Sequence, residues 1–172
     1  RLEAVATPGH TPDHLAYLLS DEQGAVALFS GGSLMVGTVG RTDLLGDEHR
    51  EELAHDMYRA LHDRILTLPD DVAVYPTHGA GSFCSAPGGA DRTTTIGRER
   101  TTDPLLSMDE GDFVAHLLAG LGSFPDYFRL LPSLNQHGLP LHDTVPALTP
   151  LTLSDLDRLT AEGAAVVAAR RT

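Results

Sequence analysis

The distribution of apolar residues predicts three short strands at the start of the chain. Apolar runs rich in Leu, Val and Ala occupy residues 2–7, 14–20 and 25–30. Pro8-Gly9 separates the first two runs, and an acidic stretch ending in Gly24 separates the second and third. Apolar runs bounded by Gly, Pro and Asp are typical of strands, and a short acidic stretch ending in Gly is typical of a hairpin loop. The first 30 residues are therefore expected to form consecutive strands.

The pattern changes to a helical period between residues 47 and 68. Leu53, Met57, Leu61 and Ile65 recur every fourth residue, and charged residues fill the positions between them. This spacing predicts an amphipathic helix with one face against a sheet. Pro69 ends the helix, and residues 72–75 form a further apolar run. Strands on both sides of a docked helix indicate an α/β layered fold.

The second half of the chain has weaker patterns. Residues 79–92 are rich in Gly, Ser, Ala and Pro, which predicts an irregular loop, and residues 93–97 fit a short strand or a turn. Helices are expected over 109–121 and 126–134, with Ser107 as the cap of the first. A Pro-rich connector leads to a short helix that opens at Ser154 and ends at Gly163, and a small apolar run over 164–169 fits a buried strand.

Composition narrows the class of protein. The chain of 172 residues has 24 acidic and 12 basic residues and a net charge of −12, a balance that disfavours binding to nucleic acid. No apolar run approaches the roughly 20 residues that span a bilayer, so no membrane association is expected. The single cysteine, Cys84, excludes a disulfide within the chain. A soluble cytoplasmic protein is expected.

Two histidines are the main candidates for chemistry. His10 lies in Thr7-Pro8-Gly9-His10-Thr11-Pro12 and His78 in Tyr75-Pro76-Thr77-His78-Gly79. Each follows an apolar run and occupies a turn, which holds an imidazole rigidly, as a metal ligand requires. The alternative for each is a capping, surface or loop-packing histidine.

Together with the segments between and after them, these motifs resemble the metallo-β-lactamase superfamily, most closely its persulfide dioxygenase branch. The resemblance implies an α/β fold, the C-terminal half of an αββα metallo-β-lactamase sandwich. It implies a metallo-β-lactamase-like domain over 1–105 with a helical extension over 106–140, a linker over 141–152 and a rhodanese-like start over 153–172. The chain opens within a strand-like run and has no His-x-His-x-Asp-His cluster. We expect it to be the C-terminal part of a longer protein.

The resemblance assigns metal-ligand roles to His10 and His78 and implies Fe(II) or Zn(II) as the cofactor. In persulfide dioxygenases the iron is held by two histidines and one carboxylate, and one of the histidines comes from the N-terminal motif. His78 is therefore expected near the metal without being a necessary iron ligand. Phe29-Ser30-Gly31-Gly32 stands where that branch reads Phe-Thr-Gly-Asp, so Gly32 replaces the acidic ligand. His14 is expected to be structural or to lie at the pocket mouth.

The remaining candidates are Arg41, Asp43 and Cys84. Val36 to Leu45 contains Gly-Arg-Thr-Asp, which resembles a segment of the same branch and implies that Arg41 borders the pocket while Asp43 orients it. A purely structural salt bridge is an equal alternative. Cys84 follows His78 closely and could carry a persulfide, whereas a lone cysteine is usually an inert apolar residue. His49, His55 and His62 are interpreted as solvated.

The functional expectation is a metal-dependent protein that oxidises thiol persulfides to sulfite, with a small thiol or persulfide as substrate and a homodimer as the assembly. Two alternatives remain open: a metallo-hydrolase of the glyoxalase II type, and a degenerate scaffold that binds a thiol or sulfur carrier. The balance of motifs favours an enzyme. Gly32 tells against both enzymatic versions, because each uses the carboxylate that it replaces.

Overall fold

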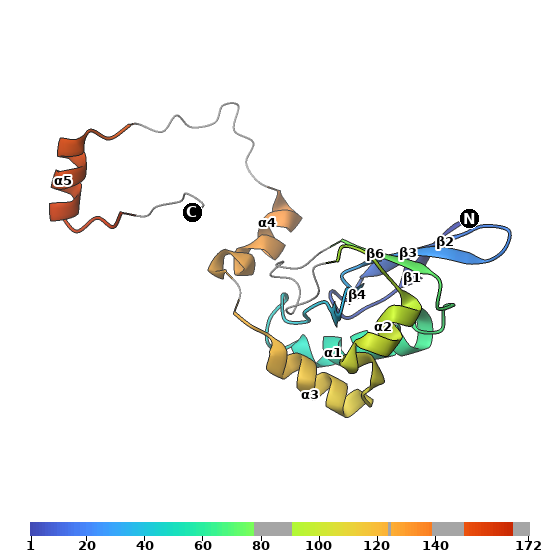
Figure 1. Ribbon diagram of the computed structural model, residues 1–172. Helices are drawn as coiled ribbons and strands as arrows, with labels where there is room; N and C mark the ends of the chain where they lie inside the picture. The colour runs from blue at the N-terminus through green and yellow to red at the C-terminus, as the bar shows by residue number, and fades with distance from the viewer. Residues whose placement is uncertain (78–90, 124, 139–149, 167–172) are drawn as a thin grey trace. The chain divides into compact units, whose positions relative to one another are not determined.

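The computed structural model describes residues 1–77, 91–123, 125–138 and 150–166. The chain divides into two compact units, Arg1–His137 and Gly138–Thr172, each of which is considered by itself. The first unit contains the sheet, most of the helices and His10 (Figure 1).

The sheet contains five strands in the described residues, in the order β1-β2-β3-β6-β7. Three of them, β1 (Leu2–Ala6), β2 (Leu15–Ser20) and β3 (Ala25–Gly31), form an antiparallel meander, as the apolar runs predicted. β6 (Ala73–Pro76) pairs parallel to β3, and the short β7 (Thr94–Thr95) pairs antiparallel to β6. The parallel pairing requires a crossover, which the helical segment between β3 and β6 provides.

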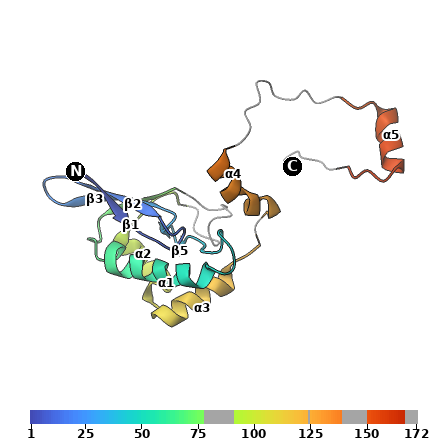
Figure 2. The same ribbon diagram turned by 180° about the vertical axis from the view of Figure 1, so that it is seen from behind.

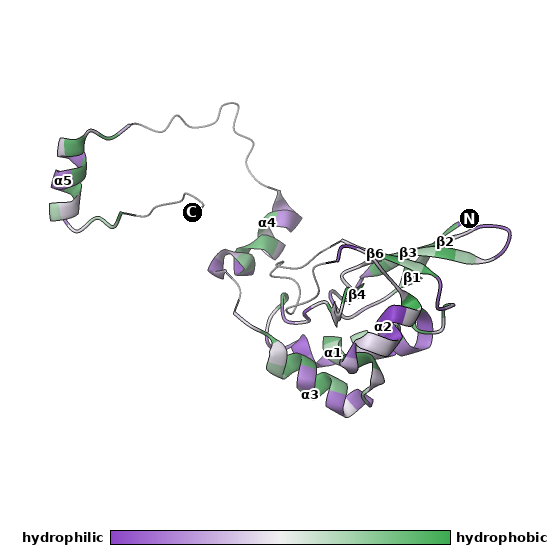
Figure 3. Cartoon of the chain, viewed as in Figure 1, coloured by the Kyte–Doolittle hydropathy of each residue, from purple (hydrophilic) through white to green (hydrophobic). Residues whose placement is uncertain are grey.

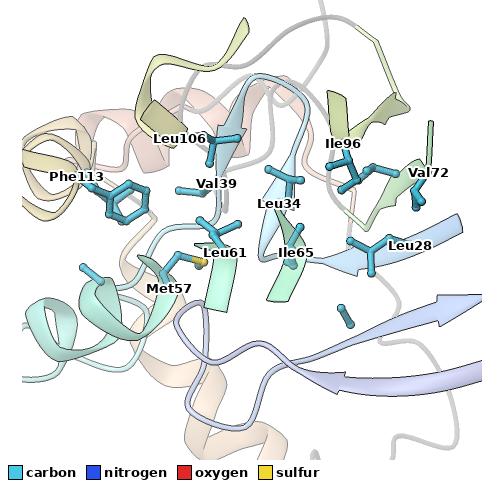
Figure 4. Packing of buried hydrophobic residues seen from close by; sticks show 14 of the residues in the cluster. Leu28, Leu34, Val39, Met57, Leu61, Ile65, Val72, Ile96, Leu106 and Phe113 are labelled. Atoms are coloured by element: carbon cyan, nitrogen blue, oxygen red, sulfur yellow. The ribbon is translucent and has the colours of Figure 1, made fainter. Parts of the chain in front are cut away.

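The predicted amphipathic helix is α1 (Arg50–Ala60), which continues as a π-helical turn, η1 (Leu61–Ile65). Its apolar stripe packs against β3, β6 and the small hairpin described below, with Met57, Leu61 and Ile65 buried (Figure 4). Glu51 and Glu52 in the first turn face the positive end of the helix dipole. Burial of this stripe fixes α1 on one face of the sheet.

A hairpin that the apolar pattern did not predict lies between β3 and α1. It consists of β4 (Leu34–Met35) and β5 (Thr38–Val39), and its apolar residues enter the core. The buried carboxylate of Glu99 accepts hydrogen bonds from Gly37 N, at 2.7 Å, and from Thr94 Oγ1, at 2.6 Å. Glu99 therefore ties the hairpin turn to β7.

The helical region that follows begins with α2 (Ile96–Thr102), where only a strand or turn was expected. It continues with η2 (Pro104–Ser107) and α3 (Glu110–Gly120), which packs on α1. Figures 1 and 2 both place α1 and α3 on the same side of the sheet. Ser107 was the wrong cap for α3: Asp109 Oδ1 accepts from Asp112 N at 2.9 Å, because Asp109 immediately precedes the first helical residue.

The last elements are short. The region predicted as one helix from residue 126 forms η3 (Asp126–Leu130) and α4 (Leu131–His137). In the second unit, α5 (Leu153–Ala161) begins with a capping box between Thr152 and Asp155. Residues 164–166 are not in a strand, and 167–169 lie outside the described residues. A search of the described residues finds no helix long and apolar enough to span a bilayer.

The sheet face opposite α1 is apolar and exposed. Leu19 lies opposite Leu2, Tyr17 opposite Ala4, and Leu15 opposite Ala6, so these side chains share a face. Phe29 lies opposite Tyr17 and stacks on Tyr75 with ring centroids 5.5 Å apart. In Figure 3, β2 and β3 have the colour of hydrophobic residues along most of their length, because these strands have apolar side chains on both faces of the sheet. An open antiparallel sheet normally presents polar residues to water, so this composition is that of a sheet covered on both sides.

Candidate metal-ligand site around His10

The turn that carries His10 is packed directly on α1. Gly9 has φ 137°, and a Cβ atom at this position would lie 2.5 Å from Met57 Cβ and 2.6 Å from Met57 Cα. The absence of a side chain lets the turn approach the helix backbone. A hydrogen bond from Thr7 N to His14 O, at 2.8 Å, closes the turn on its other side. His10 is therefore held between β1 and the core.

The His10 ring has a defined orientation. Its Nδ1 lies 2.8 Å from the carbonyl oxygen of Arg41, and the residue is 8% exposed. Because a carbonyl oxygen can only accept, Nδ1 carries the proton in this bond. In the neutral ring Nε2 then has the lone pair. This arrangement is the one that fixes the tautomer of metal-bound histidines.

Two glycines lie against the His10 ring. A Cβ atom on Gly32 would lie 2.8 Å from His10 Cγ and 2.9 Å from Nε2. A Cβ atom on Gly40 would lie 2.8 Å from His10 Nδ1 and would overlap the carbonyl oxygen of Gly32. Real Cβ atoms do not approach other atoms this closely. The ring therefore occupies the space that a side chain at position 32 would need.

His14 connects the turn of His10 to the glycines. Gly32 N donates to His14 Nε2 at 2.9 Å, so Nε2 has the lone pair and Nδ1 carries the proton that is shared with Thr7 Oγ1, at 2.7 Å. The two imidazoles lie edge to face with centroids 6.0 Å apart. His14 is a neutral bridge with both nitrogens engaged, in agreement with the structural role that was expected.

Arg41 and Asp43 form a buried ion pair. Arg41 Nε donates to Asp43 Oδ1 at 2.6 Å, and Arg41 Nη2 donates to Asp43 Oδ2 at 2.7 Å and to Gly122 O at 2.8 Å. Their side chains are 6% and 10% exposed. The bidentate pair holds the segment after β5 in place, and the bond to Gly122 O ties this segment to the residues that follow α3. It supports a positioning role for both residues, and their catalytic role stays a prediction.

The three histidines on or beside α1 differ from one another. His49 is exposed, and His55 Nδ1 lies 2.8 Å from Glu110 Oε1, which links α1 to α3. Glu110 has a lowered pKa, chiefly through its hydrogen bond with His55. The solvated interpretation is wrong for His62, because its ring lies tilted against Tyr58 with centroids 4.1 Å apart and its buried Nε2 has no hydrogen-bond partner among the described residues. Burial lowers the pKa of His62.

His78 and Cys84 lie outside the described residues. Whether the rings of His10 and His78 face a common ion therefore stays a prediction, as does a persulfide on Cys84.

The described residues fit a metal centre at His10 but not at position 32. His10 has the tautomer of a ligand, whereas the place of the expected carboxylate is filled by the His10 ring itself. Both oxygens of Asp43 are bonded to Arg41, so Asp43 does not replace the missing ligand. No group of three or more His, Cys, Asp or Glu residues suited to a metal ion occurs in the described part of the chain. These residues supply one fixed imidazole rather than a ligand set.

A cleft of about 350 Å³ lies next to this site, bordered by the segment after β5, by η3 and by α4. Asp43 and Asp47 line one side and Arg129 the other, and His10 does not belong to its lining. The cleft is large enough for a small ligand, and it borders the ion pair rather than the imidazole.

Comparison with known proteins gives relatives of two kinds. No family model matches the chain. The mitochondrial persulfide dioxygenase ETHE1 of Homo sapiens is 34% identical over 113 residues, which cover 66% of this chain and 38% of the relative. A probable metallo-hydrolase, YqgX of Bacillus subtilis, is 37% identical over 78 residues, or 45% of this chain and 33% of the relative. The chain thus spans only about a third of the length of these relatives.

Solved structures of the same kinds of protein align with the chain. A metallo-β-lactamase from Staphylococcus aureus aligns with a TM-score of 0.74 at 34% identity, covering 84% of this chain and 42% of the other. ETHE1 from Myxococcus xanthus aligns with a TM-score of 0.62 at 28% identity, covering 78% and 52%. The expected α/β fold of a partial metallo-β-lactamase domain is confirmed. The chain therefore has the fold of a partial metallo-β-lactamase domain, and its relatives in that superfamily include ETHE1 persulfide dioxygenases at modest identity.

Proposed function

We propose that the full-length protein binds a low-molecular-weight thiol or its persulfide beside His10, without the carboxylate-dependent oxidation that the persulfide dioxygenase resemblance implied. The observation that carries this proposal is the contact between His10 and Gly32. The ring keeps the orientation of a ligand, while its packing leaves no room for an acidic side chain.

The proposal that the ligand is a thiol or its persulfide rests on the relatives of the chain. Human, bovine and murine persulfide dioxygenases match the chain at 31–34% identity over 113 residues. The cleft beside Asp43, with Arg129 at its edge, supplies a cation for the carboxylate of such a ligand. The proposal also includes a rhodanese-like segment that begins at residue 153, because such a segment would suit a protein that binds a sulfur carrier.

A second candidate is oxidation of the persulfide to sulfite at an iron centre. The ligand tautomer of His10 favours it, because a hydrogen bond at Nδ1 directs Nε2 toward a metal. A glyoxalase-type hydrolase has less support, because a two-metal site would need a bridging carboxylate at position 32.

Binding and oxygen uptake by the full-length protein separate these candidates. The protein is supplied with Fe(II), and cysteine persulfide is added in a calorimeter and, separately, in an oxygen electrode. We expect binding that His10→Ala abolishes and an oxygen uptake equal to that of protein-free solution. His55→Ala is the matched control, because His55 on α1 bonds Glu110 of α3 and not the residues around His10.

Two results would contradict the proposal. Persulfide-dependent oxygen uptake with one iron per chain would establish the second candidate. Heat signals that are equal for the wild type and His10→Ala would show that the thiol is not held beside His10.

A further inference from the structure

We infer that the β4–β5 segment forms a clasp around the His10 ring, and that glycine at positions 32 and 40 is required by this clasp rather than being the remnant of a lost metal ligand. The clasp is defined as residues 32–41. The inference concerns the packing of the chain itself and does not depend on the ligand proposed above.

The first step is that the clasp touches the ring from several directions. Gly32, before β4, lies against the ring carbons and Nε2, and Gly40, after β5, lies against Nδ1. The carbonyl of Arg41 accepts from the same Nδ1 at 2.8 Å. A segment of ten residues therefore approaches a single imidazole at both of its ends.

The second step is that the ring is restrained by a hydrogen bond as well as by the glycine contacts. A shift of the ring away from a side chain at position 32 would disturb the bond from Nδ1 to Arg41 O. Gly40 is itself in close contact with the backbone of Gly32, because a Cβ atom at position 40 would overlap the Gly32 carbonyl oxygen. The two glycines thus allow the ends of the clasp to meet over the ring.

The third step is that other parts of the fold fix the clasp. Glu99 holds its turn through Gly37 N, and His14 accepts from Gly32 N at 2.9 Å. Arg41 is anchored to Asp43 and to Gly122 O. Leu34 and Val39 are fully buried beside α1 (Figure 4). Because Glu99, Leu34 and Val39 are buried, the clasp resists displacement, and a side chain at position 32 would strain its contact with the His10 ring.

Gly32→Asp therefore does not restore a metal site. The new side chain would meet the ring before its carboxylate could share an ion with Nε2. Glycine at position 32 and the present position of His10 are coupled features, and a change in one requires a change in the other.

Thermal unfolding of full-length variants tests the coupling. Gly32→Ala and Gly40→Ala are expected to lower the midpoint temperature by about 5 °C or more, because overpacking of a fixed site strains it. The matched control is Gly120→Ala, since a Cβ atom on Gly120 meets nothing within 4 Å. A midpoint for Gly32→Ala equal to that of the control would overturn the inference.

A double variant keeps the test decisive, because folding of His10→Ala/Gly32→Ala where Gly32→Ala alone does not fold would itself show the coupling. With His10→Ala as the background, the ring that opposes the new methyl group is absent. We expect Gly32→Ala to lower the midpoint by less than half as much in this background as in the wild type. An equal effect in both backgrounds would show that Gly32 does not act through His10.

Metal affinity gives a readout that a general loss of stability does not explain. Zn²⁺ affinity of the full-length protein is measured by competition with a coloured chelator at a temperature at which both proteins are folded. We expect Gly32→Asp to bind Zn²⁺ no more tightly than the wild type. A gain of about tenfold or more would show instead that position 32 is a vacant ligand position.

Discussion

At the scale of single residues, the site depends on how two imidazoles use their nitrogens. His10 donates from Nδ1 to a carbonyl, and His14 accepts at Nε2 from a backbone amide. The hydrogen-bond partner of each ring fixes its tautomer. The Thr-Pro-Gly-His-Thr-Pro motif identified His10 as the ligand candidate and His14 as structural, but the sequence could not show that a ring fills the place of the missing carboxylate. That contact joins residues 22 positions apart.

Replacing His14 tests its role as a bridge. His14→Leu leaves Gly32 N and the Thr7 hydroxyl without their partners, so we expect the unfolding free energy to fall by about 1–3 kcal/mol. His14→Gln, which can still accept from Gly32 N, should lose less. The measurement is urea denaturation of the full-length protein, with exposed His49→Leu as the control. Equal losses for the Leu and Gln variants would contradict the bridging role.

The buried carboxyl group of Asp103 leads us to expect that the free energy of unfolding depends on pH. Its side chain is buried, its Oδ1 caps η2 through Leu105 N, and its Oδ2 has no hydrogen-bond partner in the part of the chain that the structure describes. Burial, with a smaller contribution from Glu99, raises the pKa of Asp103, while Leu105 N and His116 act in the opposite direction. A raised pKa means that the folded state prefers the protonated form. The stabilisation is therefore complete below the ordinary pKa and is lost as pH rises through the raised value.

Asp103→Asn isolates this effect, because asparagine retains the cap but cannot ionise. We expect the variant to gain unfolding free energy relative to the wild type as pH rises from about 4 to 7. The measurement is urea denaturation at several pH values. Asp109→Asn at the cap of α3 serves as the control, since Asp109 makes the same kind of cap hydrogen bond at an exposed position. A difference between Asp103→Asn and wild type that is independent of pH would contradict the account.

At the scale of elements, the strongest patterns along the chain predicted the correct strands and helix. The strands β1, β2, β3 and β6 and the helix α1 follow from apolar runs and from the four-residue period. The strands β4 and β5 were missed because each has two residues, which is too short for an alternation to be recognised. Helix α2 was missed because its residues include Gly and Thr, which are poor helix formers, and tertiary contacts through Glu99 override that preference.

The contact between the His10 turn and α1 can be tested at this scale. We expect Gly9→Ala to destabilise the full-length protein by about 1–3 kcal/mol more than Gly24→Ala. Both glycines have similar backbone angles, with φ 137° and 134°, so both variants incur similar backbone strain. A Cβ atom meets Met57 at Gly9 and nothing within 4 Å at Gly24. Equal losses in urea denaturation would show that the turn is not packed on α1.

At the scale of the whole molecule, the apolar sheet face indicates that the first unit by itself has no layer covering the side of the sheet opposite α1 in the residues that the structure describes. Leu2 is 62% exposed, Phe29 is 45% exposed and Tyr75 is 44% exposed, all on the face opposite α1. Relatives are more than twice as long as the region they share with this chain. The face matches the expectation that the chain is one half of a sandwich, and the homodimer remains a prediction.

Self-association of the 172-residue chain follows from this face. We expect the chain to form dimers or larger species, and Phe29→Lys to shift it toward monomers, because a charge at the centre of the face opposes its burial. Gln23→Lys in the hairpin loop between β2 and β3 changes the net charge equally and is the control. Sedimentation velocity measures the distribution. A monomeric wild-type chain, or equal effects of both variants, would contradict the prediction.

The central claim is that the His10 ring lies directly over Gly32 in the full-length protein. Nuclear Overhauser effects between labelled histidine and glycine residues test it most directly. The account predicts a strong effect between His10 Hδ2 and the α-protons of Gly32, together with a protonated Nδ1 on His10. Absence of that effect, or a proton on Nε2 instead of Nδ1, would contradict the account.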